Sequence, residues 1–168
     1  MRKWIAIAAG LAMLVTANYL IYGKERVLTE GRIVLLRLAP VDPRSLMQGD
    51  YMALRFWVTN AVLKRGRLEG RLHDGRLRDG RIVLRLDERD VGRFVRFDDG
   101  APLGPDEVRL RYRVRDGEVK LATNAFFFRE GDAELYEAAR YGEFRVGANG
   151  EAILTGLRGS DLQPLGPK

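Results

Sequence analysis

Cysteine is absent from this 168-residue chain, and histidine occurs once, at position 73. The lack of cysteine excludes disulfides, thiolate chemistry and Cys-ligated zinc, and a single histidine disfavours a transition-metal site. We therefore expect no metal and no cofactor. His73 precedes Asp74-Gly75, a pair typical of a hairpin turn, so we expect its side chain to be exposed and without a chemical role.

Glycine-rich phosphate loops, nucleotide motifs and Ser-His-Asp sets are also missing. The net charge is +6, but acidic residues are interleaved with arginine and no block of like charge occurs. Arginine recurs at alternate positions of one segment, at Arg109, Arg111, Arg113 and Arg115. Such a row is typical of a solvated sheet face and lacks the contiguous basic footprint that phosphate binding needs. We therefore expect no nucleic-acid partner, while attraction to anionic lipid headgroups stays open.

An uncharged run of nineteen residues extends from Trp4 to Tyr22, after the basic leader Met1-Arg2-Lys3. As a helix with 1.5 Å rise per residue it would be about 28 Å long, close to the ~30 Å hydrocarbon core of a bilayer. Trp4 at one end and Tyr19 and Tyr22 at the other occupy positions that aromatic rings prefer at membrane interfaces. We expect residues 1–26 to be an uncleaved single-pass anchor in the inner (cytoplasmic) membrane, with the rest of the chain on the extracytoplasmic side.

Two other interpretations of this segment stay open. Val15-Thr16-Ala17 has small residues at offsets suited to cleavage, so the segment could be a signal peptide that is removed. The apolar run continues through Leu20, Ile21 and Tyr22, beyond that cut, which favours the anchor. The third interpretation is a buried core helix, but the run has no polar stripe of the kind that a helix facing water on one side needs.

Residues 27–165 are predicted to form one β-rich domain, barrel-like or sandwich-like, with a single short helix near 132–141. Strands are expected at 32–39, 51–58, 66–72, 76–87, 93–97, 143–146 and 151–157, with 59–65 ambiguous. The clearest hairpin runs from Val108 to Ala122, because its central Asp116-Gly117 tolerates the positive φ angles of a two-residue turn. The tail after Gly159 is expected to be frayed or extended.

One helical segment interrupts this strand pattern. Asp132 is a suitable N-cap, and Leu135, Ala138 and Ala139 form a narrow apolar stripe. Gly142 would then follow the helix at the C′ position, where a left-handed conformation is common. We therefore expect the next strand to begin directly after this glycine.

The most informative stretch lies between positions 42 and 56. Pro43 restricts Asp42 to extended geometry. Gly49-Asp50 favours a turn, because glycine reaches positive φ and aspartate can bond to the main chain two residues on. The next six residues have the period-2 pattern of a strand with two different faces. Tyr51, Ala53 and Arg55 alternate there with Met52, Leu54 and Phe56.

This stretch resembles the motif of a known family. Gly49-Asp50-Tyr51-Met52-Ala53-Leu54-Arg55-Phe56 is similar to the signature for which the GDYXXLXY family is named, with Phe56 in place of its final tyrosine. Pro40-Val41-Asp42-Pro43-Arg44 is similar to the family's lead-in. Three further segments resemble the C-terminal half of the family: Phe127-Phe128-Arg129-Glu130-Gly131, Leu135-Tyr136 and Ala139-Arg140-Tyr141-Gly142-Glu143. The likeness therefore covers most of residues 28–165.

The resemblance implies a location and a partner rather than a chemistry. Members of this family are bacterial membrane-anchored proteins without an assigned activity, often found beside a polytopic membrane protein. We therefore expect a membrane-tethered binding or accessory domain that contacts membrane lipid through its N-terminal helix and a polytopic membrane protein. An exposed apolar or aromatic patch should lie away from the motif. The signature residues expected to be structural are Asp42, Pro43, Gly49, Asp50, Tyr51, Leu54, Phe56, Glu130, Gly131, Arg140, Tyr141 and Gly142.

A hydrolase acting outside the cytoplasm is the alternative hypothesis. Ser45 lies in a segment that weakly resembles the serine region of membrane-bound signal peptidases, and Lys64 or Lys120 would then be its base. The Ser-Met-x-Pro order of those enzymes is absent, and the spacing to Gly49-Asp50 is shorter. We therefore interpret Ser45 as an ordinary turn residue.

Three carboxylates offer a second route to hydrolysis. Asp42, Asp50 and Glu130 all fall in family-like segments and could act as acid and base. The competing interpretation is that Asp42 and Asp50 cap turns and that Glu130 pairs with Arg140. The nearby aromatic residues are expected in the core rather than in a ligand cage: Tyr51, Phe56, Phe126 and Phe128.

Overall fold

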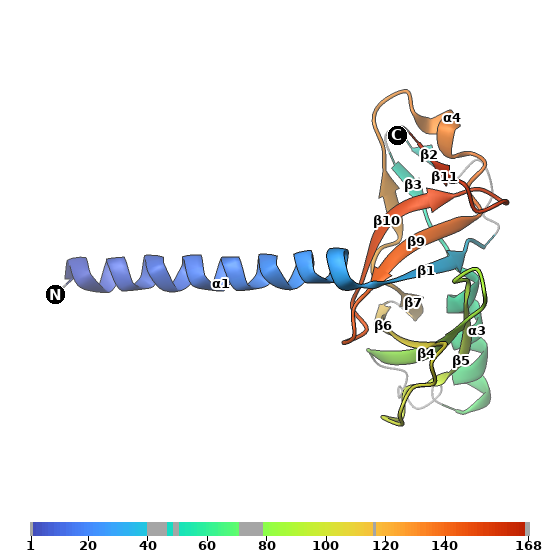
Figure 1. Ribbon diagram of the computed structural model, residues 1–168, viewed down its shortest axis with the longest axis horizontal. Coiled ribbons are helices and arrows are strands. Elements are labelled where there is room, and N and C mark those ends of the chain that lie inside the picture. Colours follow the sequence, from blue (N-terminus) through green and yellow to red (C-terminus); the bar gives the residue numbers. More distant parts are fainter. Residues whose placement is uncertain (1, 40–46, 49–50, 71–78, 116, 167–168) are drawn as a thin grey trace.

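The computed structural model describes residues 2–39, 47–48, 51–70, 79–115 and 117–166, with the side chains of residues 2, 5, 6, 8, 47 and 48 also left undescribed. A long helix projects from a β-rich body (Figure 1). The β-rich fold class is therefore confirmed. Six residues that the sequence singles out lie outside this description: Asp42, Pro43, Ser45, Gly49, Asp50 and His73.

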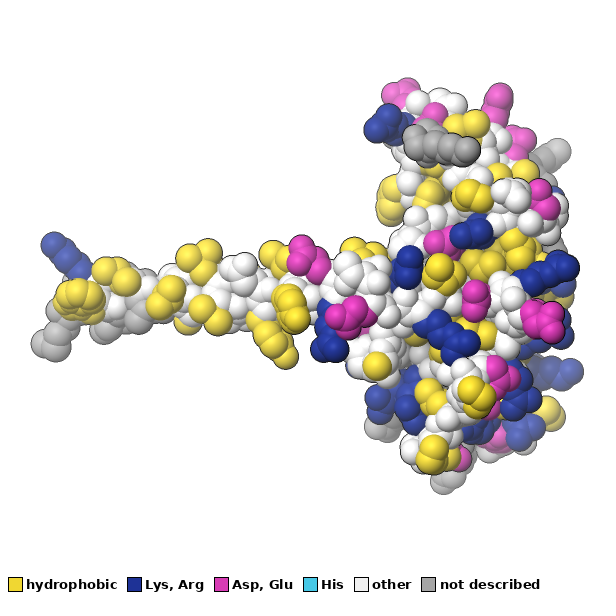
Figure 2. Space-filling model, viewed as in Figure 1, with side chains coloured by type: hydrophobic (Ala, Val, Ile, Leu, Met, Phe, Trp, Pro, Cys, Tyr) yellow, Lys and Arg dark blue, Asp and Glu magenta, His cyan; other side chains and the backbone are white. Residues whose placement is uncertain are grey.

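α1 (Arg2–Glu30) is one continuous helix of 29 residues. Its large apolar side chains stand clear of the body (Figure 2), and Trp4 and Tyr19 are 75% and 76% exposed. Within the described residues, no helix combines the length and the apolar character required to cross a membrane. The prediction of a transmembrane helix over residues 4–22 is therefore not supported by the length and apolar character of α1.

The sheet that adjoins α1 has four antiparallel strands in the order β1-β9-β10-β11. These are β1 (Arg32–Arg37), β9 (Tyr141–Val146), β10 (Ala152–Arg158) and β11 (Pro164–Leu165). The strands expected at 32–39, 143–146 and 151–157 are confirmed. The tail, expected to be frayed or extended, is extended at β11, where Leu165 lies opposite Leu157 in this sheet.

A second four-stranded sheet has the order β5-β4-β6-β7. Its strands are β4 (Gly80–Leu86), β5 (Gly92–Phe97), β6 (Glu107–Arg115) and β7 (Glu118–Lys120). The predicted Val108–Ala122 hairpin is confirmed as β6 and β7, with Gly117 in the turn at φ +75°. A third sheet joins β2 (Met47–Gln48), β3 (Tyr51–Ala53) and β8 (Ala125–Phe127).

The two larger sheets share one apolar core. A parallel bridge pairs Leu35 of β1 with Val91, and the main-chain N–H of Leu35 donates to the carbonyl of Asp90 at 2.8 Å. The side chains most completely removed from water come from both sheets and from the segment after β3: Phe56, Phe144, Leu36, Ile82, Leu84, Leu110 and Leu157. This junction fixes the β4–β5 turn against β1.

α3 (Trp57–Leu68) is the main departure from the sequence prediction. The strand predicted over 51–58 ends at Ala53, and residues 66–68, also predicted as strand, are helical. The helix forms because Val58, Val62 and Gly66 recur every four residues and bury one face. That burial outweighs the weak helix propensity of β-branched residues and glycine.

The helix predicted over 132–141 is also wrong in extent. α4 (Ala133–Tyr136) has four residues, and Asp132 makes no capping hydrogen bond through its side chain. Gly142 lies inside β9, where it pairs with Leu36 of β1 and Leu157 of β10, instead of ending a helix. Pairing on both sides of β9 therefore holds this segment in the sheet in place of a longer helix.

Candidate functional site: an arginine-lined cleft between the sheets

The described end of the motif is built into the core. The side chains of Leu54 and Phe56 are 4% and 1% exposed. The main-chain N–H of Leu54 donates to the carbonyl of Asn124 at 2.6 Å, and the Phe56 ring packs edge-on against Phe144 with centroids 5.4 Å apart. Tyr51 is half-buried, and its ring lies 5.8 Å from that of exposed Phe127. These contacts stabilise the fold and leave no polar atom free for chemistry at Leu54 or Phe56.

The two halves of the signature meet at Gly142. A Cβ atom there would lie 3.0 Å from Cε1 of Phe56, so the Phe56 ring would have to shift to accommodate a side chain. The expected pair between Glu130 and Arg140 is not formed. Arg140 Nη1 donates instead to the carbonyl oxygens of Ala139 at 2.8 Å and Glu137 at 3.4 Å, while Glu130 is exposed, as is Gly131 after it.

The described members of the proposed catalytic sets are scattered. Lys64 is exposed on α3, and Lys120 is half-buried on β7, while Ser45, Asp42 and Asp50 fall outside the described residues. Phe126 and Phe128 pack against the ring of buried Tyr136, with centroids 5.0 and 5.5 Å away. In the part of the chain that the structure describes, no group of three or more His, Cys, Asp or Glu side chains could hold a metal ion.

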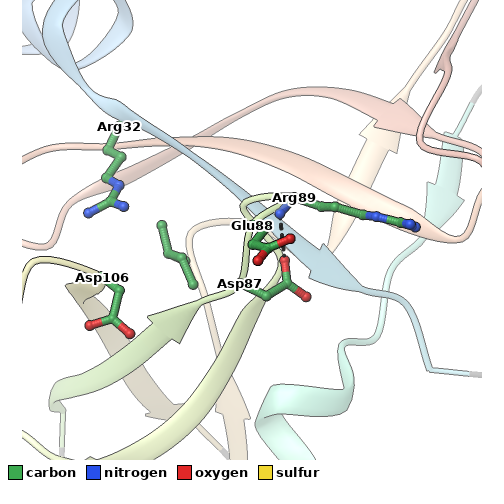
Figure 3. Close-up of a pocket in the computed structure, with 6 residues that line it drawn as sticks. Arg32, Asp87, Glu88, Arg89 and Asp106 are labelled. Atoms are coloured by element: carbon green, nitrogen blue, oxygen red, sulfur yellow. Dashed lines mark hydrogen bonds between the residues drawn. The ribbon is translucent and has the colours of Figure 1, made fainter.

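An open pocket beside the β4–β5 turn is lined by charges of both signs (Figure 3). Arg32 donates through Nη1 to the carbonyl of Pro105 at 2.9 Å, and Asp106 lies 3.3 Å from Arg85. Asp87 Oδ1 accepts the main-chain N–H of Arg89, while the Arg89 guanidinium points away from Arg32 and Asp106 in Figure 3. Arg32 and Asp87 are therefore engaged with the main chain and Asp106 with Arg85, while neither Glu88 nor Arg89 forms an ion pair with any described residue.

A second cleft, of about 680 Å³, shares Asp87 and Arg89 with that pocket. We call it the arginine cleft and define it by the five lining residues Arg37, Trp57, Arg89, Arg93 and Tyr141. It forms where the last residue of β1 and the first residue of β9 come together with the start of α3 and the start of β5. Tyr141 is a signature residue, and Trp57 directly follows the motif.

A close approach of β5 to β1 positions the cleft arginines. A Cβ atom on Gly92 would lie 3.1 Å from Val34 Cγ1 and 3.3 Å from Leu36 Cδ2, so β5 approaches β1 closely because position 92 has no side chain. Arg93 follows Gly92 on β5, and Arg37 is the last residue of β1. The approach therefore places guanidinium groups from two sheets around one opening.

Several arginines elsewhere on the body are paired with acids, but Arg111 and Arg113 of β6 are exposed without an ion pair in the described structure, as the cleft arginines are. Within the described residues, Arg37, Arg89 and Arg93 make no ion pair, although all three are exposed. The neighbouring sheet surface carries paired arginines: Arg81 and Arg109 with Asp98, Arg85 and Arg96 with Glu107, and Arg115 with Asp79. Among the described lining residues, the cleft therefore carries three guanidinium groups against the single carboxylate of Asp87.

Asp87 is the carboxylate that lines the arginine cleft. Its Oδ1 accepts the main-chain N–H groups of Arg89 at 2.9 Å and Val91 at 3.0 Å, so it serves as the cap of the β4–β5 turn. On the neighbouring sheet, by contrast, the carboxylate of Glu107 faces the guanidinium groups of Arg85 and Arg96. The hydrogen bond from Arg96, followed by that from the Gly104 main chain, lowers the pKa of Glu107.

The sequence interpretation missed this site because it assigned arginine to solvated sheet faces. That assignment holds for β6, but Arg37, Arg89 and Arg93 lie on three separate parts of the fold. The available signal was Trp57, because Val58 and Val62 bury the face beside it and leave the indole 48% exposed.

Comparison with known proteins gives one kind of finding. The chain matches a protein-family model described as GDYXXLXY protein over residues 13–157. Neither a curated protein nor a solved structure matches it. The matched range begins inside α1 and includes both segments that meet at Gly142.

Proposed function

This chain belongs to the GDYXXLXY family, and we propose that it is a membrane-tethered extracytoplasmic β-domain that binds a membrane-protein partner. The observation that carries the proposal is the surface of α1. Ten large apolar side chains between Trp4 and Tyr22 are more than half exposed: Trp4, Ile7, Leu11, Met13, Leu14, Val15, Tyr19, Leu20, Ile21 and Tyr22. Burial of apolar surface is worth roughly 25 cal/mol per Å², so a helix with this surface is strongly driven out of water.

The position of α1 relative to the body fits a tether. Charged residues resume at Lys24, which forms an ion pair with Glu151 in the turn between β9 and β10. The body therefore starts immediately beyond the apolar run. Lys3 at the opposite end and the aromatic residues Trp4 and Tyr22 would lie at the two interfaces of a bilayer.

Binding, rather than catalysis, is the role that the body supports best. Lys64 and Glu130, two residues of the hydrolase hypothesis, are exposed on different elements and form no cluster with each other in the described structure. The arginine cleft offers unpaired charge and an exposed indole, which are features of recognition surfaces.

The tether can be tested with single engineered cysteines, because the chain has none of its own. We expect Ala122→Cys, at an exposed position of the body outside the arginine cleft, to react with a membrane-impermeant maleimide in intact spheroplasts. Lys3→Cys should react only after the membrane is permeabilised. The full chain should also stay in the membrane pellet after alkaline carbonate extraction. Protection of Ala122→Cys in intact spheroplasts, or release of the chain into the soluble fraction, would contradict the proposal.

A further inference from the structure

We propose that the arginine cleft binds an acidic segment of a protein partner, in which Asp or Glu side chains flank an apolar residue. This inference deepens the proposed function, on which it rests, by naming the chemistry of the partner segment. In the part of the chain that the structure describes, three guanidinium groups without an ion pair line the cleft, and the carboxylate of Asp87 beside them accepts two main-chain N–H groups. Carboxylates are suited to such a site because guanidinium groups bind them with two parallel hydrogen bonds.

Aromatic side chains supply the apolar part of the site. Trp57 is 48% exposed at the start of α3, and Tyr141 is half-buried at the start of β9. Tryptophan, tyrosine and arginine are the residues that dominate the binding energy of protein interfaces. The cleft gathers all three residue types, so an apolar side chain between acidic ones would meet the indole.

The first turn of α3 adds to the preference for a carboxylate. Trp57 and Val58, the first two residues of this 12-residue helix, both line the cleft. The N-cap residue is Phe56, which makes no side-chain capping bond, although its carbonyl accepts the main-chain N–H of Thr59 at 3.1 Å, and the helix dipole is positive at this end. A partner carboxylate beside Trp57 could take the place of the missing cap.

The distance from the tether favours a protein over the lipid surface. From Tyr22 to the end of α1 the helix advances about 12 Å, and β1 then advances about 17 Å to Arg37. Figure 1 shows β1 leading away from α1, with α3 on the side of the body remote from that helix. Headgroup charges are screened over about 8 Å at physiological salt. The cleft therefore faces away from the membrane in which α1 would lie.

The test uses the full chain in non-ionic detergent micelles and fluorescence anisotropy of a rhodamine-labelled octapeptide. The peptide has three Glu and three Asp around a central Leu-Leu, and its counterpart has Gln and Asn in their place. We expect the acidic peptide to bind at least about tenfold more tightly than the amide peptide, and Arg37→Gln/Arg93→Gln to remove at least about tenfold of that affinity. Trp57→Ala should weaken binding severalfold.

The matched control is Arg111→Gln/Arg113→Gln, which removes the same charge from exposed positions of β6 outside the cleft. It should keep the affinity within about twofold to threefold. Equal losses in the two double variants, or equal binding of the two peptides, would overturn the proposal. Circular dichroism checks folding, and Arg93→Glu gives a second measurement, because it should lower binding of the acidic peptide and raise binding of a Lys-substituted one.

Lipid is tested in a separate arm with vesicles of phosphatidylglycerol and phosphatidylcholine. Binding to the anionic vesicles that depends on Arg37 and Arg93, together with failure to bind the acidic peptide, would replace the proposed partner by a lipid surface. Peptide binding in micelles does not depend on the tether. If the chain binds the peptide but is released from the membrane by carbonate, the tether is refuted and the proposal for the cleft is not.

Discussion

Gly142 lies where three core side chains would crowd an added methyl group. Its Cβ would be 3.0 Å from Phe56 Cε1 and 3.2 Å from both Leu154 Cδ1 and Phe144 Cε2. We predict that Gly142→Ala lowers the free energy of unfolding by about 1–3 kcal/mol through overpacking. Urea unfolding of the full chain in detergent measures the effect.

A matched glycine on the adjacent strand separates overpacking from a general effect of glycine replacement. Gly156 of β10 has no atom within 4 Å of the position of its Cβ, so Gly156→Ala should change stability by about 0.5 kcal/mol or less. Adding Phe56→Leu to Gly142→Ala should cost less than the sum of the two single changes, because the shorter side chain relieves the clash. Strict additivity would show that the contact between the two signature segments does not cause the loss.

At the scale of elements, one carboxylate ties three strands together. Glu107 of β6 accepts Nη1 of Arg96 on β5 at 3.0 Å and lies 3.3 Å from Nη2 of Arg85 on β4. The Arg96 bond, with that from the Gly104 main chain, lowers the pKa of Glu107 below its usual value of 4.5. The unfolded chain therefore takes up this proton at a higher pH than the folded chain does.

The sign of the pH dependence follows from that difference. The stabilisation from Glu107 is fully present above pH 4.5 and is lost as the pH falls through the lower pKa of the folded state. We predict that Glu107→Gln is less stable than the parent at neutral pH and loses less stability between neutral pH and pH 3. Urea unfolding across this range measures both effects, with Glu118→Gln on β7 as the exposed control. A parent-like slope for Glu107→Gln would contradict the prediction.

The elements that the sequence predicts well are those whose local signals agree with their tertiary contacts. The β6–β7 hairpin combines alternating side chains with Asp116-Gly117, so its place is readable without the fold. α3 has poor local signals at Thr59 and Gly66, and its helix depends on burial that a sequence does not reveal. Near α4 the local signals at Asp132 and Gly142 are good, but pairing of β9 with two strands overrides them.

The arginine cleft shows the corresponding limit for the site. Arg37, Trp57, Arg93 and Tyr141 come from four elements, and the register of β1, β9 and β5 brings them together. No spacing along the chain encodes that arrangement. The sequence does contain the signature. Its described positions Leu54 and Phe56 are buried in the core, and Phe56 is the N-cap residue of α3.

For the whole molecule, the joint between α1 and the body decides which way the cleft faces. Val27 is 7% exposed, and the Gly31 main-chain N–H donates to its carbonyl at 3.0 Å. Arg145 Nη1 of β9 donates to the carbonyl of Gly31 at 3.1 Å, and Lys24 pairs with Glu151, whose pKa is lowered first by that Lys24 hydrogen bond. We infer that the helix and the body move as one unit.

We predict that Val27→Asp loosens this joint, because an uncompensated carboxylate in a buried apolar contact is strongly unfavourable. Spin labels at Leu20→Cys and Ser160→Cys, in lipid nanodiscs, report the distance between α1 and the far side of the body by pulsed electron paramagnetic resonance. The parent should give a narrow distribution and Val27→Asp a broad one. Leu28→Asp, the same change at an exposed neighbour, should keep it narrow. Broad distributions in all three would mean a flexible joint, and the cleft could then swing toward the membrane surface, which would remove the geometric argument for a protein partner over lipid.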